Sequence, residues 1–215
     1  MKIIRRLLIF VILAIAVLSI VSFWLTSEAS EKYPIHYNEL IEKYAKENKV
    51  DPFLVAAVIR VESNYQPDAR SHMNAYGLMQ ILPETGEWIA GRLGEEFEVN
   101  KLTDPEYNIR YGTYYLRYLM DYFGRTQLAL AAYNGGLTNV NNWLNTPEYS
   151  KDGKTLDFIP FDETNNYVKK VTDYYENYQR VYHNQFPIKE IDSGNKLNFQ
   201  GENFKNFLLE SANKF

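Results

Sequence analysis

Apolar side chains recur with helical spacing over most of the chain after residue 33. Residues 35–48 follow the i, i+3, i+4, i+7, i+8 spacing of an amphipathic helix. Its apolar face is formed by Tyr37, Leu40, Ile41, Tyr44 and Ala45. Asp51-Pro52 then supplies an N-cap followed by proline at the first helical position. Residues 53–61 are apolar on nearly every side, which predicts a helix buried in the middle of a domain.

Further helix signals continue to residue 182. Helices are expected at 84–92, from Asp104-Pro105 to residue 123, at 127–133 before Gly135-Gly136, and at 139–144. A long helix capped by Asp162 should follow, with one stripe formed by Tyr167, Val171, Tyr174, Tyr175, Tyr178 and Tyr182. Hardly any stretch alternates with period two, so the predicted fold is mainly α, with at most a minor hairpin around residues 147–161.

The N-terminus indicates the compartment. Three basic residues among the first six precede residues 7–25, a run whose only polar members are Ser19 and Ser22. Such a run approaches the ~20 apolar residues that span a bilayer and exceeds the ~7–15 of a cleavable signal. We expect an uncleaved signal anchor with the rest of the chain outside the cytoplasm. Cleavage near Ser27-Glu28-Ala29 is the alternative, and it would also place the protein outside, as a secreted chain.

These patterns divide the chain into three parts. Residues 1–30 would be a transmembrane segment with a polar tether, and residues 31–187 a single folded domain. Residues 188–215 would form a polar C-terminal extension, rich in Asn and Lys, with a last short helix near Phe204 and Leu208.

Composition excludes several classes of function. The chain of 215 residues is 46% hydrophobic and 23% charged, with a net charge of −4, which disfavours nucleic acid as a partner. It has no cysteine, and its three histidines are scattered at positions 36, 72 and 183, so neither a metal nor another cofactor is implied. The 18 Tyr and 12 Phe suit stacking on sugar rings, although most should be core. We expect a monomer.

Glu62 is the residue most suited to acid–base chemistry. It follows the apolar helix and shares a face with Val55, Val58 and Ile59. The negative end of the helix dipole and the apolar neighbours both disfavour a charged carboxyl, so its pKa should be raised. A carboxyl of this kind can act as a general acid near neutral pH. A solvated glutamate at a helix end is the alternative from this feature alone.

Four sequence blocks favour the general-acid interpretation of Glu62 over the solvated glutamate. They are ESNYQP with ARS at 62–71, GLMQILPET at 77–85, AAYNGG at 131–136 and IPFDETNNYV at 159–168. In this order and spacing they resemble the soluble lytic transglycosylase (SLT) family over about residues 35–184. The resemblance implies a lysozyme-like catalytic domain of the goose-type/SLT class, acting on the glycan strands of peptidoglycan.

The resemblance also implies roles for matching residues. Glu62 would be the only catalytic acid/base. Substrate would be bound by Ser71, Met79, Gln80, Tyr133, Asn134, Glu163 and Tyr167. The sequence departs from the family at Asn165, where arginine is common, and at Leu82, where many members have methionine.

The implied reaction cleaves the β-1,4 bond between N-acetylmuramic acid and N-acetylglucosamine and closes a 1,6-anhydro ring without water. A hydrolytic muramidase of the same fold is one alternative, and it would need a second carboxylate such as Asp68, Glu84 or Asp104. A wall-binding component of a secretion or conjugation machine, without turnover, is the other.

Overall fold

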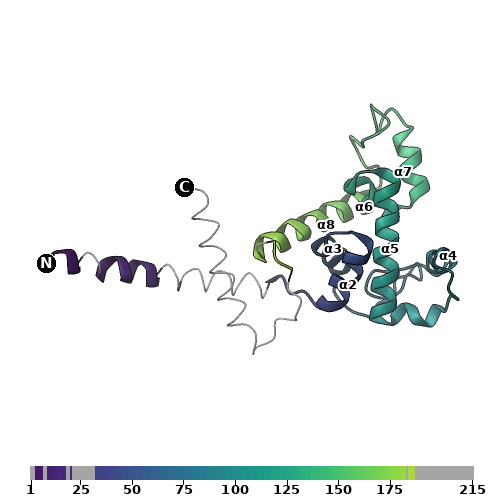
Figure 1. Cartoon of the computed structure of the whole chain (residues 1–215). Helices are drawn as coiled ribbons and strands as arrows, with labels where there is room; N and C mark the ends of the chain where they lie inside the picture. The colour runs from purple at the N-terminus through teal and green to yellow at the C-terminus, as the bar shows by residue number, and fades with distance from the viewer. Residues whose placement is uncertain (1–2, 7–8, 18–19, 21–31, 183, 187–215) are drawn as a thin grey trace. The chain divides into compact units, whose positions relative to one another are not determined.

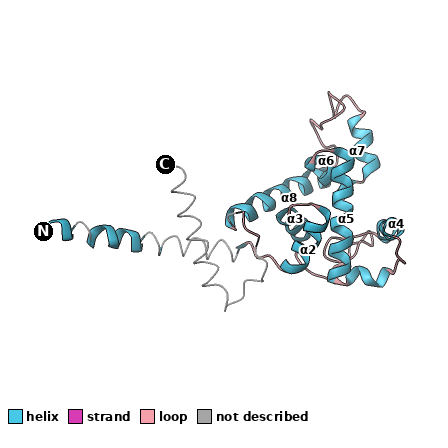
Figure 2. Cartoon of the chain, viewed as in Figure 1, coloured by secondary structure: helices cyan, strands magenta, loops and turns pink. Residues whose placement is uncertain are grey.

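The computed structural model describes residues 3–6, 9–17, 20, 32–182 and 184–186. Figures 1 and 2 show helices joined by loops, and within these residues the only β contacts are isolated bridges. The chain divides into two compact units. One is Tyr37–Glu176, and the other combines the chain before Tyr37 with the chain after Glu176. The prediction of a mainly α fold is confirmed.

The helices follow the predicted order. They are α2 (Asn38–Asn48), α3 (Pro52–Ser63), α4 (Pro83–Leu93), the 3-10 helix η1 (Val99–Thr103), α5 (Pro105–Phe123), α6 (Thr126–Gly135), α7 (Leu137–Leu144) and α8 (Asp162–Val181). Only η1 was not expected. The long last helix begins at Asp162, so this residue lies in its first turn.

Two predicted caps set where helices begin. The Asp51 carboxylate accepts a hydrogen bond of 2.8 Å from the backbone N–H of Phe53, and the Asp104 carboxylate accepts one of 2.8 Å from Tyr107 N–H. In each case proline follows the cap, where its missing N–H costs nothing. The sequence signals at both positions are confirmed.

Helix α3 supplies the centre of the Tyr37–Glu176 unit. Its residues from Phe53 to Ile59 are all buried. Helix α5 packs beside both α2 and α6 (Figure 1). Because α3 is apolar on all sides, it needs neighbours on all sides, and this places its C-terminal end inside the domain.

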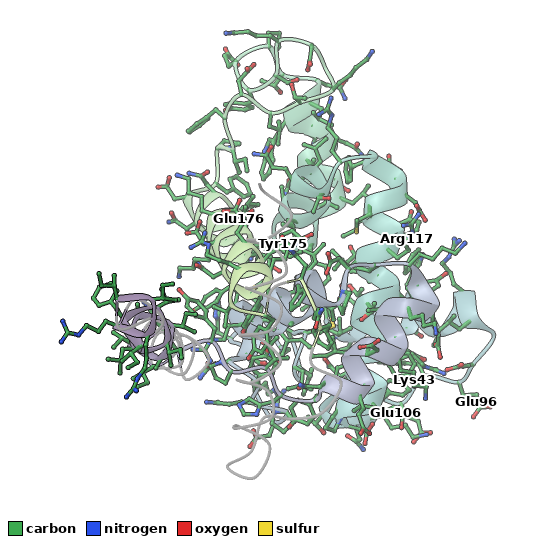
Figure 3. The ribbon with its side chains drawn as sticks, turned by 60° about the vertical axis from the view of Figure 1, so that its left-hand side comes forward. Lys43, Glu96, Glu106, Arg117, Tyr175 and Glu176 are labelled. Atoms are coloured by element: carbon green, nitrogen blue, oxygen red, sulfur yellow. The ribbon has the colours of Figure 1, made fainter. Side chains whose placement is uncertain are left out.

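Polar contacts hold the helices around this core. Lys43 of α2 and Glu106 of α5 point toward each other in Figure 3, with their charged atoms 2.8 Å apart. The hydroxyl of Tyr44 donates to the same carboxylate at 2.7 Å. The hydroxyl of Tyr175 in α8 donates to the Asp51 carboxylate at 2.9 Å, which ties α8 to the start of α3.

In the other unit, Tyr178 of α8 and Tyr182, the residue after that helix, bond to the backbone of residues 33–34. The hydroxyl of Tyr182 donates to the carbonyl of Tyr33 at 2.8 Å, and that of Tyr178 donates to the carbonyl of Pro34 at 3.3 Å. The rings of Tyr33 and Tyr178 meet edge to face, with centroids 6.2 Å apart. The tyrosine stripe therefore serves packing here.

The segment between α7 and α8 contains turns and bends, and the described residues show no hairpin strand there. Asp157 N–H donates to the carbonyl of Tyr149 at 2.9 Å. The Asp152 carboxylate accepts from the N–H groups of Lys154 and Thr155 at 2.8 and 2.7 Å, which lowers the pKa of Asp152 to about 2. Hydrogen bonds from the backbone to the Asp152 side chain therefore stabilise this segment in place of strand pairing.

Two predictions concern the chain ends. In the part of the chain that the structure describes, no helix is both long enough and apolar enough to cross a membrane. The expected transmembrane segment at 7–25 lies only partly within the described residues, and the C-terminal extension from residue 188 lies outside them. Both stay predictions.

Candidate active site

Glu62 lies in the last turn of α3, where the helix meets the loop that precedes α4. Asn64 ends the helix in the left-handed conformation, with φ of 52°. The Ser63 hydroxyl donates to the carbonyl of Leu78 at 2.8 Å, which fixes the helix end to that loop. Val55, Val58 and Ile59 are fully buried, as the helical register predicted, and Glu62 itself is partly buried.

The surroundings of Glu62 raise the pKa of its carboxyl to about 7. Burial is the main cause, because it penalises the charged form. The Tyr167 hydroxyl lowers the pKa by favouring the carboxylate, and the negative charge of Glu163 raises it. Near neutral pH the carboxyl is therefore divided between its protonated and ionised forms, which suits a group that must both give and take a proton.

Two phenols share the site with Glu62. The Tyr133 hydroxyl, from α6, donates to the backbone carbonyl of Met79 at 2.8 Å. The Tyr167 hydroxyl, from α8, is buried without a partner of full hydrogen-bond geometry, although it is close enough to influence Glu62. Burial and the charge of Glu62 raise both phenol pKa values well above normal. Both phenols therefore stay protonated and can donate.

The loop before α4 carries three of the predicted substrate-binding residues, Ser71, Met79 and Gln80. Within this loop, Tyr76 forms isolated antiparallel β-bridges with Arg70 and with Ile81. The Ser71 hydroxyl accepts from the N–H groups of Met73 and Ala75 at 3.2 and 3.0 Å. These bonds stabilise the turn, and the hydroxyl hydrogen is left to reach another acceptor.

Gln80 has the left-handed backbone conformation, with φ of 49°. Its amide nitrogen donates to the carbonyls of Gly77 and Ala69, at 2.8 and 3.2 Å. Since the nitrogen is engaged, the amide oxygen of this partly exposed residue is the atom that can accept from a ligand.

Met79 is placed in the core, with its side chain fully buried. A Cβ added to Gly112 of α5 would lie 2.4 Å from the Met79 sulfur, so this helix comes close because residue 112 is glycine. The Met79 side chain therefore does not reach the surface. Its backbone carbonyl is the part that takes part in the site, as the acceptor for Tyr133.

Asn108 of α5 holds this loop in place, and the sequence analysis missed it. Its amide oxygen accepts from Met79 N–H at 2.7 Å, and its nitrogen donates to the carbonyls of Tyr76 and Leu102 at 2.8 and 2.7 Å. Asn108 is fully buried. A polar residue four positions before Gly112, on an apolar helix face, was the available signal.

Helices α6 and α8 meet through Asn134. Its amide oxygen accepts from the Thr164 hydroxyl at 2.7 Å. A Cβ at Gly135 would lie 2.9 Å from the same hydroxyl, so glycine permits the approach. Asn134 is thus a structural support, and it holds the start of α8, where exposed Glu163 lies.

The structure brings together only part of the predicted set. Tyr167 and Glu163 each shift the pKa of Glu62, and Glu62 in turn raises the pKa values of Tyr133 and Tyr167. Asp68, Glu84 and Asp104, proposed as second carboxylates, are exposed, and none contributes to the pKa of Glu62. Among the residues that the structure describes, no group of three His, Asp or Glu side chains could hold a metal.

Comparison with known proteins gives a consistent family. The model of the transglycosylase SLT domain matches residues 39–156. The soluble lytic murein transglycosylase of Escherichia coli K12 is 36% identical over 152 residues, covering 67% of this chain and 23% of that protein. The membrane-bound lytic murein transglycosylase C of Actinobacillus pleuropneumoniae is 29% identical over 168 residues, covering 67% of this chain and 46% of its own length.

Solved structures agree with this family. The crystal structure of the 70-kDa soluble lytic transglycosylase of Escherichia coli superposes with a TM-score of 0.65 at 31% identity, over 77% of this chain and 27% of that one. The structure of the lytic transglycosylase Slt of Pseudomonas aeruginosa, in an inactive mutant, gives 0.64 at 31% identity and covers 76% and 28%. The chain thus spans less than half the length of these relatives.

Proposed function

Because the chain belongs to the transglycosylase SLT family, with its lysozyme-like fold, we propose that it is a peptidoglycan lytic transglycosylase whose only general acid/base is Glu62. The substrate is the glycan strand, and the bond cleaved is the β-1,4 link from N-acetylmuramic acid to N-acetylglucosamine. The observation that carries the proposal is the Glu62 carboxyl, with its pKa raised to about 7 beside two protonated phenols.

In the first step, protonated Glu62 gives its proton to the glycosidic oxygen, and the bond from C1 of the muramic residue to that oxygen breaks. Positive charge develops at C1 and the ring oxygen. The newly formed carboxylate, with Glu163 nearby, provides negative charge close to this cation. The Tyr167 hydroxyl favours the ionised form of Glu62 and so assists its loss of the proton.

In the second step, the Glu62 carboxylate takes the proton from the C6 hydroxyl of the same muramic residue. The O6 atom bonds to C1 and closes the 1,6-anhydro ring. One bond to C1 has broken, one has formed, and the proton has returned to Glu62. No water is consumed, so a single carboxyl is sufficient.

The hydrolytic alternative is supported by one feature, the presence of Glu163 near Glu62. A second carboxylate could activate water, which would then attack C1 in place of O6. Such products would carry reducing ends and be heavier by one water molecule. Of the carboxylates in the described residues, Glu163 is the one that perturbs Glu62, so it replaces Asp68, Glu84 and Asp104 as the candidate for this role.

Mass spectrometry of reaction products tests the proposal. Purified full-length chain is incubated with peptidoglycan, beside Glu62→Gln and the control Glu87→Gln, which changes an exposed glutamate of α4. We expect anhydro ends from the wild type and the control, and a loss of several orders of magnitude in turnover for Glu62→Gln. Reducing ends on the wild-type products would show instead that the enzyme is a hydrolytic muramidase. Lack of turnover by the wild type would indicate a wall-binding component.

The proposal includes a location outside the cytoplasm, with residues 7–25 as a membrane anchor. It is supported by the charged start and apolar run of the sequence. Among described residues, Phe10 and Ile12 are 71% and 63% exposed, which calls for an apolar surrounding. Membrane fractionation should find the full chain in the membrane and a chain beginning at Glu31 in the soluble fraction as a monomer. Aggregation of the shortened chain would contradict the anchor.

A further inference from the structure

The backbone turn at residues 77–80 is the part of the loop before α4 that other helices hold most closely. Its two ends, Gly77 and Gln80, have the left-handed conformation, with φ of 78° and 49°. The N–H of Gln80 donates to the carbonyl of Gly77 at 3.2 Å and closes the turn. Glycine adopts this conformation freely, whereas glutamine does so only at a cost in free energy. Contacts from the surrounding structure must therefore hold the turn in this shape.

Hydrogen bonds hold the peptide group between Leu78 and Met79 from both sides. The Leu78 carbonyl accepts from the Ser63 hydroxyl at 2.8 Å, and the Met79 N–H donates to the amide oxygen of Asn108 at 2.7 Å. Ser63 directly follows Glu62 in the last turn of α3. Because a peptide group is planar, it cannot rotate without breaking both bonds. The end of α3 and helix α5 are thus joined through one peptide group.

The Asn108 side chain has a single orientation that satisfies this arrangement. Its amide nitrogen donates to the carbonyls of Tyr76 and Leu102 at 2.8 and 2.7 Å. A Cβ at Gly77 would lie 2.3 Å from the same nitrogen, so the turn lies directly against the amide. Rotating the amide by 180° would place its N–H groups against the N–H of Met79. The fully buried side chain therefore fixes the direction in which the turn runs.

The held turn determines where the Tyr133 hydroxyl donates its proton. The Met79 carbonyl, in the same residue as the N–H that Asn108 binds, accepts from Tyr133 at 2.8 Å. A phenol has one proton to donate, so this bond keeps it from the Glu62 carboxylate. Accordingly, Tyr167 is the phenol that lowers the pKa of Glu62.

From these contacts we infer that Asn108 is a positioning residue for the reaction. By holding the Leu78–Met79 peptide, it directs the Tyr133 hydroxyl to the Met79 carbonyl and away from Glu62, so that the acid keeps its proton until the glycosidic oxygen takes it. Asn108 is fully buried and acts through the backbone, without touching a reacting atom. The inference rests on the proposed function of Glu62.

The groups around Glu62 come from three helices. Tyr167 and Glu163 of α8 shift the pKa of Glu62, and Glu62 raises the pKa of Tyr133 of α6. Tyr115 of α5 packs on Tyr133, with ring centroids 5.6 Å apart, and also raises the pKa of that phenol. Tyr133 therefore stays protonated, and once released from its carbonyl it would donate to ionised Glu62. Such a bond favours the carboxylate and lowers the pKa of the acid.

The test measures kcat of the full-length chain on soluble glycan strands as a function of pH. Asn108→Ala should lower kcat by about tenfold to a hundredfold, the effect of a small misplacement in a site. The alkaline limb of its profile, which reports the acid in the complex, should move to lower pH. Asn48→Ala is the matched control, because it also removes an amide that donates to a backbone carbonyl, that of Tyr44 in α2. It should change neither kcat nor the limb.

Asn108→Asp separates positioning from general support. It keeps an acceptor for the Met79 N–H, but its buried carboxyl faces the carbonyls of Tyr76 and Leu102, so it should be destabilised and yet keep kcat within about fivefold. Equal losses of kcat in folded Asn108→Ala and Asn108→Asp would overturn the inference.

A double-mutant cycle tests the route through Tyr133. When Asn108→Ala is added to Tyr133→Phe, kcat should fall by less than about threefold, because the hydroxyl on which Asn108 acts is already absent. If the two losses multiply instead, Asn108 only supports the fold and the inference is wrong.

Two phenol variants decide the matter even if the Asn108 variants fail to fold. Tyr167→Phe should move the alkaline limb to higher pH, since its hydroxyl lowers the pKa of Glu62. Tyr133→Phe should leave the limb in place, because that hydroxyl is donated to Met79. An upward shift in Tyr133→Phe equal to that in Tyr167→Phe would show that Tyr133 already donates to Glu62, against the inference.

Failure of this inference differs from failure of the proposed function. A wild-type chain that leaves peptidoglycan intact overturns the proposed function. A wild-type chain that forms anhydro products, together with multiplying losses in the cycle, overturns only the role of Asn108. The pKa of Glu62 in each phenol variant can also be followed by carbon-13 NMR of its carboxyl, which requires no turnover.

Discussion

The cost of holding Glu62 in its site can be measured as a stability that depends on pH. In the folded chain its pKa is about 7, against 4.5 for an ordinary glutamate. Because the folded state binds the proton more tightly than the unfolded state, the wild type should lose stability as pH rises from about 4.5 to about 7. Above that range the loss is complete and constant.

The magnitude follows from the shift. Each pKa unit corresponds to about 1.4 kcal/mol, so the displacement from 4.5 to about 7 corresponds to at most about 3.5 kcal/mol. Glu62→Gln keeps the shape and has no charge at any pH. The free energy of unfolding of the variant should therefore exceed that of the wild type most near pH 8. This part of the difference should vanish near pH 4. A part of the gain is offset because the new amide N–H groups need acceptors.

The assay is urea unfolding of both chains at several pH values between about 4 and 8, with extrapolation to water. Glu87→Gln is the control for removing a glutamate charge from an exposed position. The reasoning fails if the stability difference between Glu62→Gln and the wild type does not change with pH. It also fails if the variant is the less stable chain by a growing margin as pH rises.

Three further predictions concern the loop that carries the site. Gly112→Ala should destabilise the domain by about 1–3 kcal/mol, measured by urea unfolding, because its Cβ would meet the sulfur of Met79 at 2.4 Å. Asn108→Ala should cost about 3 kcal/mol or more in the same measurement, since the buried N–H of Met79 and the carbonyl of Leu102 lose their bonds to Asn108. The carbonyl of Tyr76 loses one bond as well but keeps the one from Ile81 N–H. Ser71→Ala and Gln80→Ala should each lower turnover on peptidoglycan by about tenfold to a thousandfold while the domain stays folded, as circular dichroism can check. If a lower melting temperature of these variants accounts for their lost activity, the role of Ser71 and Gln80 is structural.

Helix positions were predictable because their signals are local. Asp51 and Asp104 cap the next turn and are each followed by proline, so two helix starts can be read from four residues. The apolar spacing of α2 and α5 required no knowledge of their partners. By contrast, η1 is a 3-10 helix of five residues with one buried residue, Leu102. A piece this short has no repeating apolar pattern, so the sequence does not predict it.

The site was predictable in part. Counting helical turns back from Glu62 to Val55 indicated a carboxyl beside apolar side chains, and the raised pKa follows from that burial. Its neighbours Tyr133 and Tyr167 come from two other helices, and periodicity cannot bring them together. Tyr167 in particular lies on an apolar stripe, where packing was the simpler interpretation. Only the family resemblance placed both phenols near Glu62.

Helix α5 shows why the remaining features escaped prediction. It contributes no proposed catalytic group, yet Asn108 and Gly112 position the Met79 carbonyl that receives the Tyr133 hydroxyl. The same helix presents Tyr115 to Tyr133, with ring centroids 5.6 Å apart. Each of these residues acts through a contact distant in sequence, so its type alone says little. One helix without a proposed catalytic group thus supports the loop that carries the candidate site.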